Sequence, residues 1–293
     1  MKLDKERALA IIKAALKEDI GSGDITSTAL IDKLAGSRAS IVTKEDCVVC
    51  GIEIAEWVMS QVETSVRFKP NCKDGNFVGG GKELAFLEGH AASILRAERT
   101  MLNFLSVLSG IATAAKTFVD KAKPYGVKIM DTRKTLPLLR YLEKYAVFTG
   151  GGTNHRMGLF DRVLIKDNHI RVSCIVNRES SNVKKNTLKD LVELARKKNA
   201  KGTIVEIEVT SIEEFNDALA GKPDIIMLDN MSVADAKACV EIRRLAKIKP
   251  LIEVSGGIGL DNVEEYAKTK VDMISVGSLT DSFKSIDMSL EIV

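Results

Sequence analysis

From residue 127 onward, short apolar runs rich in β-branched residues alternate with amphipathic stretches of helical period. This alternation predicts strands and helices in turn, and hence a parallel sheet with right-handed crossovers. The predicted strands are Val127–Met130, Val163–Ile165, Ile204–Val209, Ile225–Leu228, Leu251–Val254 and Met273–Val276. The predicted helices are Leu188–Lys198, Ile212–Ala220, Val233–Ala246 and Asp261–Lys268, with capping residues at Thr187, Ser211, Ser232 and Asp261.

The length of this region decides between barrel sizes. A full barrel of eight strand–helix units usually needs about 250 residues, and the stretch from Val127 to Val293 is much shorter. We therefore expect a short parallel α/β barrel of about six strands. An open, doubly wound sheet is the alternative.

The first part of the chain has a different pattern. Segments 37–51, 64–69 and 82–91 resemble strands of an antiparallel sheet, and 91–122 resembles one or two helices. Residues 1–27 carry charges among their apolar positions, which predicts an amphipathic helix instead of a signal peptide. The sequence thus predicts an α/β protein with an N-terminal α+β, sandwich-like domain (1–112) and a barrel domain (113–293).

Composition narrows the class of protein. Hydrophobic residues make up 45% of the chain and charged residues 28%, with a net charge of +3, which is too small to indicate nucleic acid. We expect no segment to approach the roughly 18 apolar residues of a membrane span, and we therefore expect a cytoplasmic protein without membrane or nucleic-acid partners. The five cysteines are irregularly spaced, and we interpret Cys47 and Cys50 as buried packing residues, not as a metal or redox site.

Cations are concentrated between Asp131 and Arg171, a stretch that contains ten Lys, Arg and His residues but only four acids. Active sites of α/β barrels lie at the carboxyl ends of the strands. The predicted strand ends carry Asp131–Lys134, Lys166–His169, Glu206 and Glu208, Asp229–Asn230, Ser255–Gly257 and Gly277–Ser278. One barrel mouth would thus combine cations, acids and two glycine turns, which predicts a strongly anionic ligand.

Each group suits part of such a ligand. Backbone N–H groups of the two glycine turns, each expected just before a helix, can bind a terminal phosphate. Glu208 and Asp229 suit ribose hydroxyls or a magnesium ion that carries pyrophosphate. Because arginine grips a planar carboxylate with two hydrogen bonds, the cations Arg133, Lys134, His155 and Arg156 indicate a second anion with more than one carboxylate.

Two other functions fit parts of this pattern. A lyase or aldolase could use Lys166 as a Schiff-base nucleophile on a sugar phosphate. A non-catalytic sensor could bind a phosphorylated metabolite without turnover. Neither explains the multi-arginine pocket together with the two acids. No P-loop or dinucleotide-binding glycine motif is present in the sequence.

Several stretches resemble a known family, nicotinate-nucleotide pyrophosphorylase (carboxylating), also called quinolinate phosphoribosyltransferase. They are "ALKEDIGSGDITS", "RAERTMLNFLSVLSGIAT", "DTRKT", "EKYAV", "GGGTNHRMGLFDRVLIKDNHI", "EIEVTS", "IIMLDNM", "EVSGGI" and "VDMISVGSLT". The resemblance implies phosphoribosyl transfer from phosphoribosyl pyrophosphate to quinolinate with decarboxylation, giving nicotinate mononucleotide, carbon dioxide and pyrophosphate for NAD synthesis. It also implies Mg²⁺ and a homodimer with active sites shared between subunits. A related molybdenum-transport-associated protein is the runner-up.

The resemblance also implies roles for residues at matching positions. The implied substrate-binding residues are Arg99, Thr132, Arg133, Lys134, His155, Arg156, Lys166, Glu208, Asp229, Ser255, Gly256, Gly257, Val276, Gly277 and Ser278. Among them Lys134, Lys166, Glu208 and Asp229 are implied to be catalytic, and Glu208 and Asp229 to hold the metal. Arg99 is expected to act in the partner subunit's site. The chain departs from the family at "TLPLL" (135–139) and at Asp281, where members often carry histidine.

Overall fold

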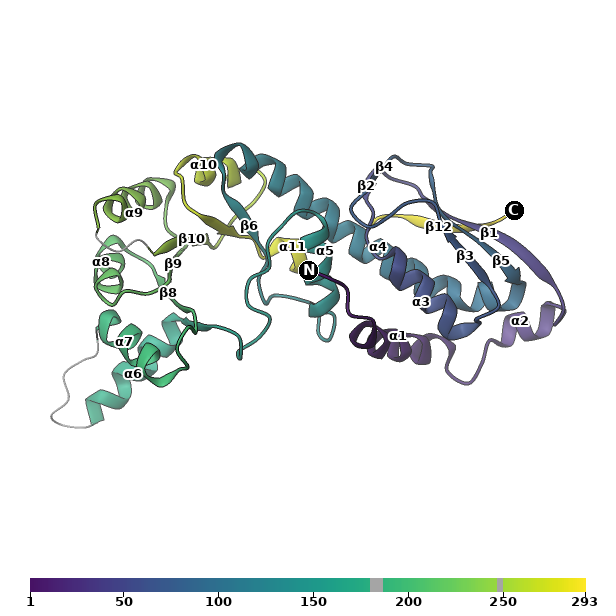
Figure 1. Cartoon of the computed structure of the whole chain (residues 1–293), viewed down its shortest axis with the longest axis horizontal. Coiled ribbons are helices and arrows are strands. Elements are labelled where there is room, and N and C mark those ends of the chain that lie inside the picture. Colours follow the sequence, from purple (N-terminus) through teal and green to yellow (C-terminus); the bar gives the residue numbers. More distant parts are fainter. Residues whose placement is uncertain (180–186, 247–249) are drawn as a thin grey trace. The chain divides into compact units, whose positions relative to one another are not determined.

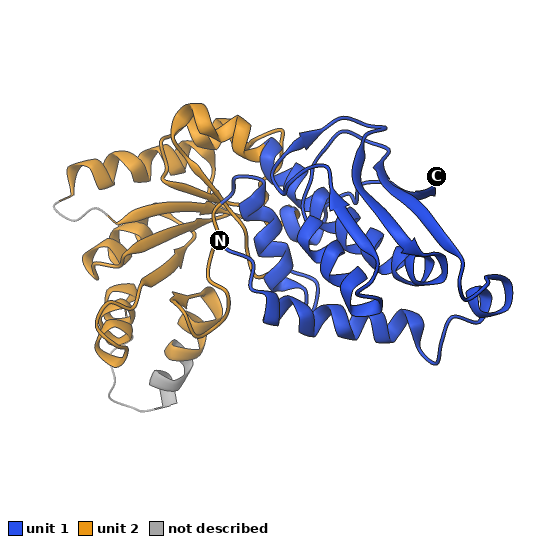
Figure 2. Cartoon of the chain, turned by 45° about the vertical axis from the view of Figure 1, so that its right-hand side comes forward, with its two compact units in different colours: residues 1–117, 135–152, 279–293 blue, residues 118–134, 153–278 orange. Residues whose placement is uncertain are grey.

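The computed structural model describes residues 1–179, 187–246 and 250–293, and it divides into two compact units. Unit 1 comprises 1–117, 135–152 and 279–293, and unit 2 comprises 118–134 and 153–278 (Figure 2). Both units are therefore assembled from segments that are distant in the sequence. The predicted boundary at 112/113 falls inside a single long helix, α4 (Ala91–Ala122).

Unit 1 is built on an antiparallel sheet with strand order β12-β1-β5-β3 (Figure 1). Its strands are β1 (Gly36–Thr43), β3 (Arg67–Pro70), β5 (Glu83–His90) and β12 (Met288–Ile292), and β2 (Cys47–Val48) pairs separately with β4 (Phe77–Val78). β12 comes from the end of the chain and pairs with β1, Ala39 opposite Ile292 and Thr43 opposite Met288. The C-terminus thus completes the N-terminal sheet, which the sequence analysis did not predict.

The helices of unit 1 begin at side-chain caps where the sequence supplies them. They are α1 (Lys5–Ile20), α2 (Ile25–Leu30), α3 (Ile52–Val62), α5 (Arg140–Thr149) and most of α4. The Asp4 carboxylate accepts a hydrogen bond from the Arg7 N–H, and the Asp24 carboxylate accepts one from the Ser27 N–H. The stretch 91–122 is one helix and not two.

Helix α4 corrects one expectation of the sequence analysis. By length and composition alone, Ala91–Tyr125 is apolar enough to cross a membrane, although we had expected no such segment. In the structure 56% of its most apolar window is buried inside the protein. Ile94, Met101 and Leu105 are fully buried. These apolar residues of α4 therefore form part of the protein core.

Unit 2 contains the six predicted parallel strands in the order β6-β11-β10-β9-β8-β7. They are β6 (Lys128–Met130), β7 (Val163–Ile165), β8 (Val205–Val209), β9 (Ile225–Asp229), β10 (Leu251–Ser255) and β11 (Met273–Ser275). Successive strands are neighbours, and the last strand pairs with the first, which is barrel order and not the reversing order of a doubly wound sheet. The prediction of a short six-stranded barrel is confirmed. Among the described residues, β6 and β7 are not paired with each other. An isolated parallel β-bridge joins Met130 of β6 to Thr153.

The helices of unit 2 lie outside the curved sheet (Figure 1). They are α6 (Asp167–Glu179), α7 (Leu188–Lys198), α8 (Ile212–Ala220), α9 (Val233–Leu245) and α10 (Val263–Lys268). Helix α11 (Ser278–Asp281) begins at the last residue of unit 2, and its other residues belong to unit 1. Thr187, Ser211 and Ser232 cap α7, α8 and α9 as predicted. The Asp261 cap was wrong, because α10 begins at Val263 after Asn262, whose side chain makes no capping bond.

Strand register determines which side chains face the barrel interior. Residues paired across parallel strands project to the same face, and neighbours along a strand alternate. Met227 pairs with both Glu208 and Glu253, and Asp229 pairs with Ser255. Buried Met130, Ile225 and Met273 form one apolar cluster. The same inner face therefore carries this cluster and, further along, a row of polar side chains.

Candidate active site

The barrel interior holds a group of buried polar side chains. His155 Nε2 lies 3.2 Å from Glu206 Oε1 and 3.6 Å from Glu253 Oε1, and both carboxylates are fully buried. Arg162 Nη1 donates to the other oxygen of Glu206 at 3.2 Å, and Ser275 Oγ donates to Glu253 at 2.5 Å. These contacts join three strands and the segment 155–162 into one hydrogen-bonded network.

The hydrogen bonds of His155 determine how its ring is oriented. The Arg156 backbone N–H donates to His155 Nδ1 at 2.7 Å. Nδ1 is therefore the accepting nitrogen, and Nε2 is the nitrogen that faces the two carboxylates. His155, Glu206 and Glu253 place possible ligand atoms within 4.8 Å of one another. A metal at Nε2 would require a proton on Nδ1, opposite the Arg156 N–H, so the observed geometry favours a hydrogen-bonded network.

Asp131 positions the start of this segment. Its buried carboxylate accepts a 2.7 Å hydrogen bond from the His155 backbone N–H and a 2.6 Å bond from Asn154 Nδ2. A backbone hydrogen bond supports the same arrangement, because the Asp131 N–H donates to the carbonyl of Thr153 at 3.2 Å. Asp131 therefore holds the backbone at Asn154 and His155 in place, and with it the segment that carries His155 and Arg156.

The cations at the mouth repel one another. Arg156 is buried, and desolvation, followed by the positive charge of Arg133, lowers the pKa of its guanidinium, whereas Glu206 opposes this shift. Thr132, on the turn after β6, accepts a 3.0 Å hydrogen bond from the Lys134 N–H. Because like charges repel, two arginines this close favour the binding of an anion between them.

The predicted catalytic acids lie on neighbouring strands. Lys166 Nζ donates to Glu208 Oε2 at 2.7 Å, and Glu208 is buried while Lys166 is half-buried. Asp229, at the end of β9, accepts a 2.9 Å hydrogen bond from Asn230 Nδ2. Both carboxylates belong to the inner face of the barrel, at its carboxyl end.

The first glycine turn differs from the predicted arrangement. Gly256 and Gly257 have φ angles of +92° and +60°, which glycine adopts without strain. They do not stand directly before a helix, because residues 258–262 separate them from α10. A Cβ on Gly256 would lie 2.3 Å from Asn230 Oδ1, whereas one on Gly257 would meet nothing within 4 Å.

The second turn agrees better with the prediction. Gly277 directly precedes α11, which begins at Ser278. The Val276 N–H donates to the Met130 carbonyl at 3.0 Å, which ties the turn to β6. Val276 itself is fully buried. The turn is thus held by the barrel, with Gly277 and Ser278 partly accessible.

Most of the predicted site residues belong to one unit. All except Arg99 lie in unit 2, on strand ends or on the segments that follow them. Arg99 is exposed on the part of α4 that belongs to unit 1. It makes no hydrogen bond or ion pair with any residue of 1–179, 187–246 or 250–293, so the pairing with Glu98 that would explain it structurally is not found there.

Sequence reasoning missed part of the site. Glu253, Ser275 and Arg162 received no role, and Glu206 was noted only as a strand-end acid. A usable signal existed for Glu253, since an acid inside the apolar run "LIEVS" needs a partner if the strand is buried on both faces. His155 was assigned to substrate, whereas both of its ring nitrogens contact protein atoms here.

The cysteines lie outside this site. Cys47 and Cys50 are fully buried in unit 1, and desolvation raises the pKa of both thiols. Within the described part of the chain, the group of possible metal ligands contains neither of them. Packing thus remains our interpretation of the C-x-x-C motif.

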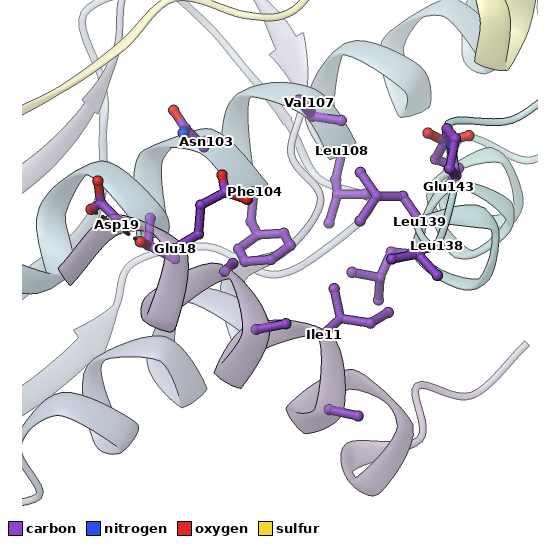
Figure 3. A pocket seen from close by; sticks show the side chains of 16 residues that line it. Ile11, Glu18, Asp19, Asn103, Phe104, Val107, Leu108, Leu138, Leu139 and Glu143 are labelled. Carbon is purple, nitrogen blue, oxygen red and sulfur yellow. Dashed lines mark hydrogen bonds between the residues drawn. The ribbon is translucent and has the colours of Figure 1, made fainter. Parts of the chain in front are cut away.

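A cavity of about 570 Å³ in unit 1 offers a second place for a ligand (Figure 3). It lies among α1, α4 and the segment before α5, with Ile11, Phe104 and Leu139 on its walls. Its charged lining residues are Glu18, Asp19 and Glu143, and none of its lining residues is a cation. This cavity does not suit an anionic substrate, in contrast to the barrel mouth.

The fold and site define a class: a parallel-barrel enzyme for anionic, phosphorylated substrates. Comparison with known proteins identifies the family. Residues 24–109 match the N-terminal domain and residues 111–291 the C-terminal domain of quinolinate phosphoribosyl transferase. The chain belongs to the quinolinate phosphoribosyltransferase family.

Individual relatives agree along the full chain. A probable nicotinate-nucleotide pyrophosphorylase [carboxylating] of Methanocaldococcus jannaschii is 42% identical, covering 99% of this chain and 98% of that protein. Quinolinate phosphoribosyltransferase [decarboxylating] 1 of Nicotiana glauca is 40% identical, covering 96% and 81%. The solved nicotinate-nucleotide pyrophosphorylase of Francisella tularensis superposes with a TM-score of 0.89 at 39% identity, covering 100% and 98%.

Proposed function

We propose that the protein transfers the phosphoribosyl group of phosphoribosyl pyrophosphate to quinolinate and decarboxylates the product to nicotinate mononucleotide, a step in NAD biosynthesis. The observation that carries this proposal is that the family's motif residues in unit 2 gather at the carboxyl edge of one parallel sheet. That edge combines Lys166 and Glu208 with Asp229 and the Gly256 turn. The comparisons support this function and not the molybdenum-transport alternative.

The cations suit the two adjacent carboxylates of quinolinate. The positive charge of Arg133 is close enough to lower the pKa of Arg156, and a dicarboxylate would relieve that repulsion. Lys134 is exposed on the same segment. Nicotinic acid lacks the 2-carboxylate and would leave part of this positive charge unpaired, at a cost of several kcal/mol as an order of magnitude.

The reaction then needs mainly positioning and electrostatics. The pyridine nitrogen forms a bond to C1 of the ribose while the C1–O bond to pyrophosphate breaks, and pyrophosphate leaves with the bonding electrons. The carboxylates of Glu208 and Asp229 stabilise positive charge that develops on the sugar, and Lys166 holds Glu208 in place. The positively charged ring then accepts the electron pair left when the 2-carboxylate departs as carbon dioxide, and C2 takes a proton from water.

Magnesium fits the same acids. Mg²⁺ prefers oxygen ligands and is usually held by one or two carboxylates together with substrate phosphates. Glu208 and Asp229 lie on neighbouring strands with side chains on one face. When bound there, Mg²⁺ would neutralise charge on the leaving pyrophosphate.

The geometry disfavours the Schiff-base alternative for Lys166. A nucleophilic lysine must lose its proton, which burial in an apolar pocket or a nearby cation promotes. Lys166 is half-buried, and its amino group contacts the Glu208 carboxylate at 2.7 Å, so its nearest charged neighbour is an acid and not a cation. Lys166 therefore suits an electrostatic role.

Arg99 suits a shared-site homodimer. It is exposed and unpaired within the described ranges, and a two-fold dimer would let it reach the partner's barrel. Homodimers of Arg99→Ala and of Arg156→Ala should each be inactive. After mixed unfolding and reassembly, random pairing should restore roughly a quarter of the wild-type activity per site. Hybrid dimers that form but stay as inactive as their parents would refute sharing.

The experiment that tests the function compares two acceptors. With phosphoribosyl pyrophosphate and Mg²⁺ saturating, quinolinate should be turned over efficiently and nicotinic acid at least about a hundredfold less well in kcat/KM, as the loss of a few kcal/mol implies. Equal turnover of both acceptors would contradict the assignment of the cations to the 2-carboxylate.

A further inference from the structure

The barrel interior contains an acid to which the proposed reaction gives no role. Glu253 on β10 is fully buried. Its Oε1 accepts a hydrogen bond from Ser275 at 2.5 Å, whereas its Oε2 is buried without a partner among the described residues. An ionised carboxylate with a bare, buried oxygen is costly. The surroundings of Glu253 therefore favour the neutral acid.

The charges around Glu253 lead to the same conclusion. The groups that face it are Glu206 from β8, Ser275 from β11, and His155 and Arg162 from the segment after β6. Arg162 is paired with Glu206 at 3.2 Å. The Arg156 N–H donates to His155 Nδ1, so Nε2 is the ring nitrogen that faces the two carboxylates. Since Arg162 is already paired with Glu206, a proton on Glu253 removes the repulsion between the two carboxylates.

This group is connected to the cations of the mouth through His155. His155 contacts both acids with its ring and receives the backbone N–H of Arg156. A second negative charge below Arg156 would compensate part of the positive charge that a dicarboxylate needs. The charge of Glu253 thus bears on substrate affinity.

We propose that Glu253 is a positioning residue for quinolinate: held as a neutral acid beneath His155 and Arg156, it leaves their positive charge for the substrate's two carboxylates. The inference rests on the proposed function and names a group that controls its substrate affinity. Ionisation of Glu253 then weakens quinolinate binding without removing any group that touches the substrate. Burial, followed by the charge of Glu206, raises the pKa of Glu253 to about 7, so this ionisation falls in an accessible pH range.

The test is the pH dependence of KM for quinolinate between pH 6 and 8.5, with phosphoribosyl pyrophosphate and Mg²⁺ saturating. Both carboxyl groups of quinolinate are already ionised there. In the wild type, KM should rise by about tenfold across this range, corresponding to about one pKa unit of interaction. In Glu253→Gln, which keeps the neutral amide, KM should stay near its low-pH value throughout.

A matched control comes from the other unit. Burial also raises the pKa of Glu143 to about 7, but this residue belongs to unit 1 and to none of the site contacts. Glu143→Gln should retain the wild-type rise of KM. A second variant tests the inference even if Glu253→Gln does not fold. The Ser275 hydroxyl lowers the pKa of Glu253. Its removal in Ser275→Ala should therefore move the rise of KM to higher pH.

The outcomes separate this inference from the function itself. A rise of KM that persists unchanged in Glu253→Gln, or that does not move in Ser275→Ala, would overturn the inference. So would a stoichiometric metal ion in the wild type that Glu253→Gln loses, because the buried group would then be a metal site. Calorimetry of quinolinate binding distinguishes the remaining case: pH-dependent binding without any product contradicts the proposed function and supports the role of Glu253.

Discussion

Replacing Gly256 by alanine should damage the site through two separable effects. Its φ of +92° is one that residues with a Cβ rarely adopt, at a cost of about 1 to 2 kcal/mol. The added Cβ would also lie 2.3 Å from Asn230 Oδ1, about 1 Å inside ordinary contact. Asn230 must then move, and Asp229 loses the 2.9 Å hydrogen bond that Asn230 donates, worth about 1.5 to 3 kcal/mol for a charged acceptor.

Gly257→Ala is the matched control. Gly257 also has a positive φ, +60°, but a Cβ there meets nothing within 4 Å, so this variant carries the backbone cost alone. We expect the KM for phosphoribosyl pyrophosphate to rise about tenfold or more further in Gly256→Ala than in Gly257→Ala, since each 1.4 kcal/mol is a factor of ten. Urea unfolding should confirm that both variants are folded.

The double variant Gly256→Ala with Asn230→Gly isolates the clash. It removes the side chain that the new Cβ would meet, so the local backbone should regain its position, while the missing hydrogen bond to Asp229 keeps KM raised. Equal KM values for the two single alanine variants would refute the idea that Gly256 makes room for Asn230. The glycine would then serve only the conformation of the turn.

Two further predictions concern charge. Burial raises the pKa of Glu143 from 4.5 to about 7, so between these values the unfolded chain ionises while the folded chain stays protonated, and the free energy of unfolding falls as pH rises. The free energy of unfolding of Glu143→Gln, measured in urea, should therefore rise relative to that of the wild type by roughly 2 kcal/mol between pH 5 and pH 8. The same difference between variant and wild type at both pH values would contradict this. Lys166→Met leaves the buried Glu208 without its partner at 2.7 Å; kcat/KM should fall at least about a hundredfold, with little change in thermal stability because Lys166 is half-exposed, and near-normal turnover would exclude its role.

The repeating part of the fold was readable from sequence. All six barrel strands and helices α7 to α10 lie at or within two residues of the predicted bounds, because apolar β-branched runs and side-chain caps are local signals. The missed features depend on distant contacts. β12 is a short strand whose partner, β1, lies at the opposite end of the chain, and α5 lies inside the cation-rich segment where charge obscured the helical period.

The grouping of several candidate residues at one edge of the sheet was predictable for a related reason. Residues at the carboxyl ends of parallel strands converge wherever the fold places them, so Lys166, Glu208 and Asp229 could be grouped without coordinates. The hydrogen bonds beneath them could not. Glu253 lies beside His155, and the Arg156 N–H donates to His155 Nδ1. These contacts follow from strand register and from a loop conformation, neither of which a periodic pattern encodes.

The most direct test of the proposed function follows the fate of the 2-carboxylate. Quinolinate labelled with ¹³C in that group is incubated with the protein, phosphoribosyl pyrophosphate and Mg²⁺, and labelled carbon dioxide and mononucleotide are measured together. We predict one labelled carbon dioxide for each unlabelled nicotinate mononucleotide formed, and neither product when phosphoribosyl pyrophosphate is omitted. A mononucleotide that retains the label, or carbon dioxide released without the sugar donor, would contradict the account.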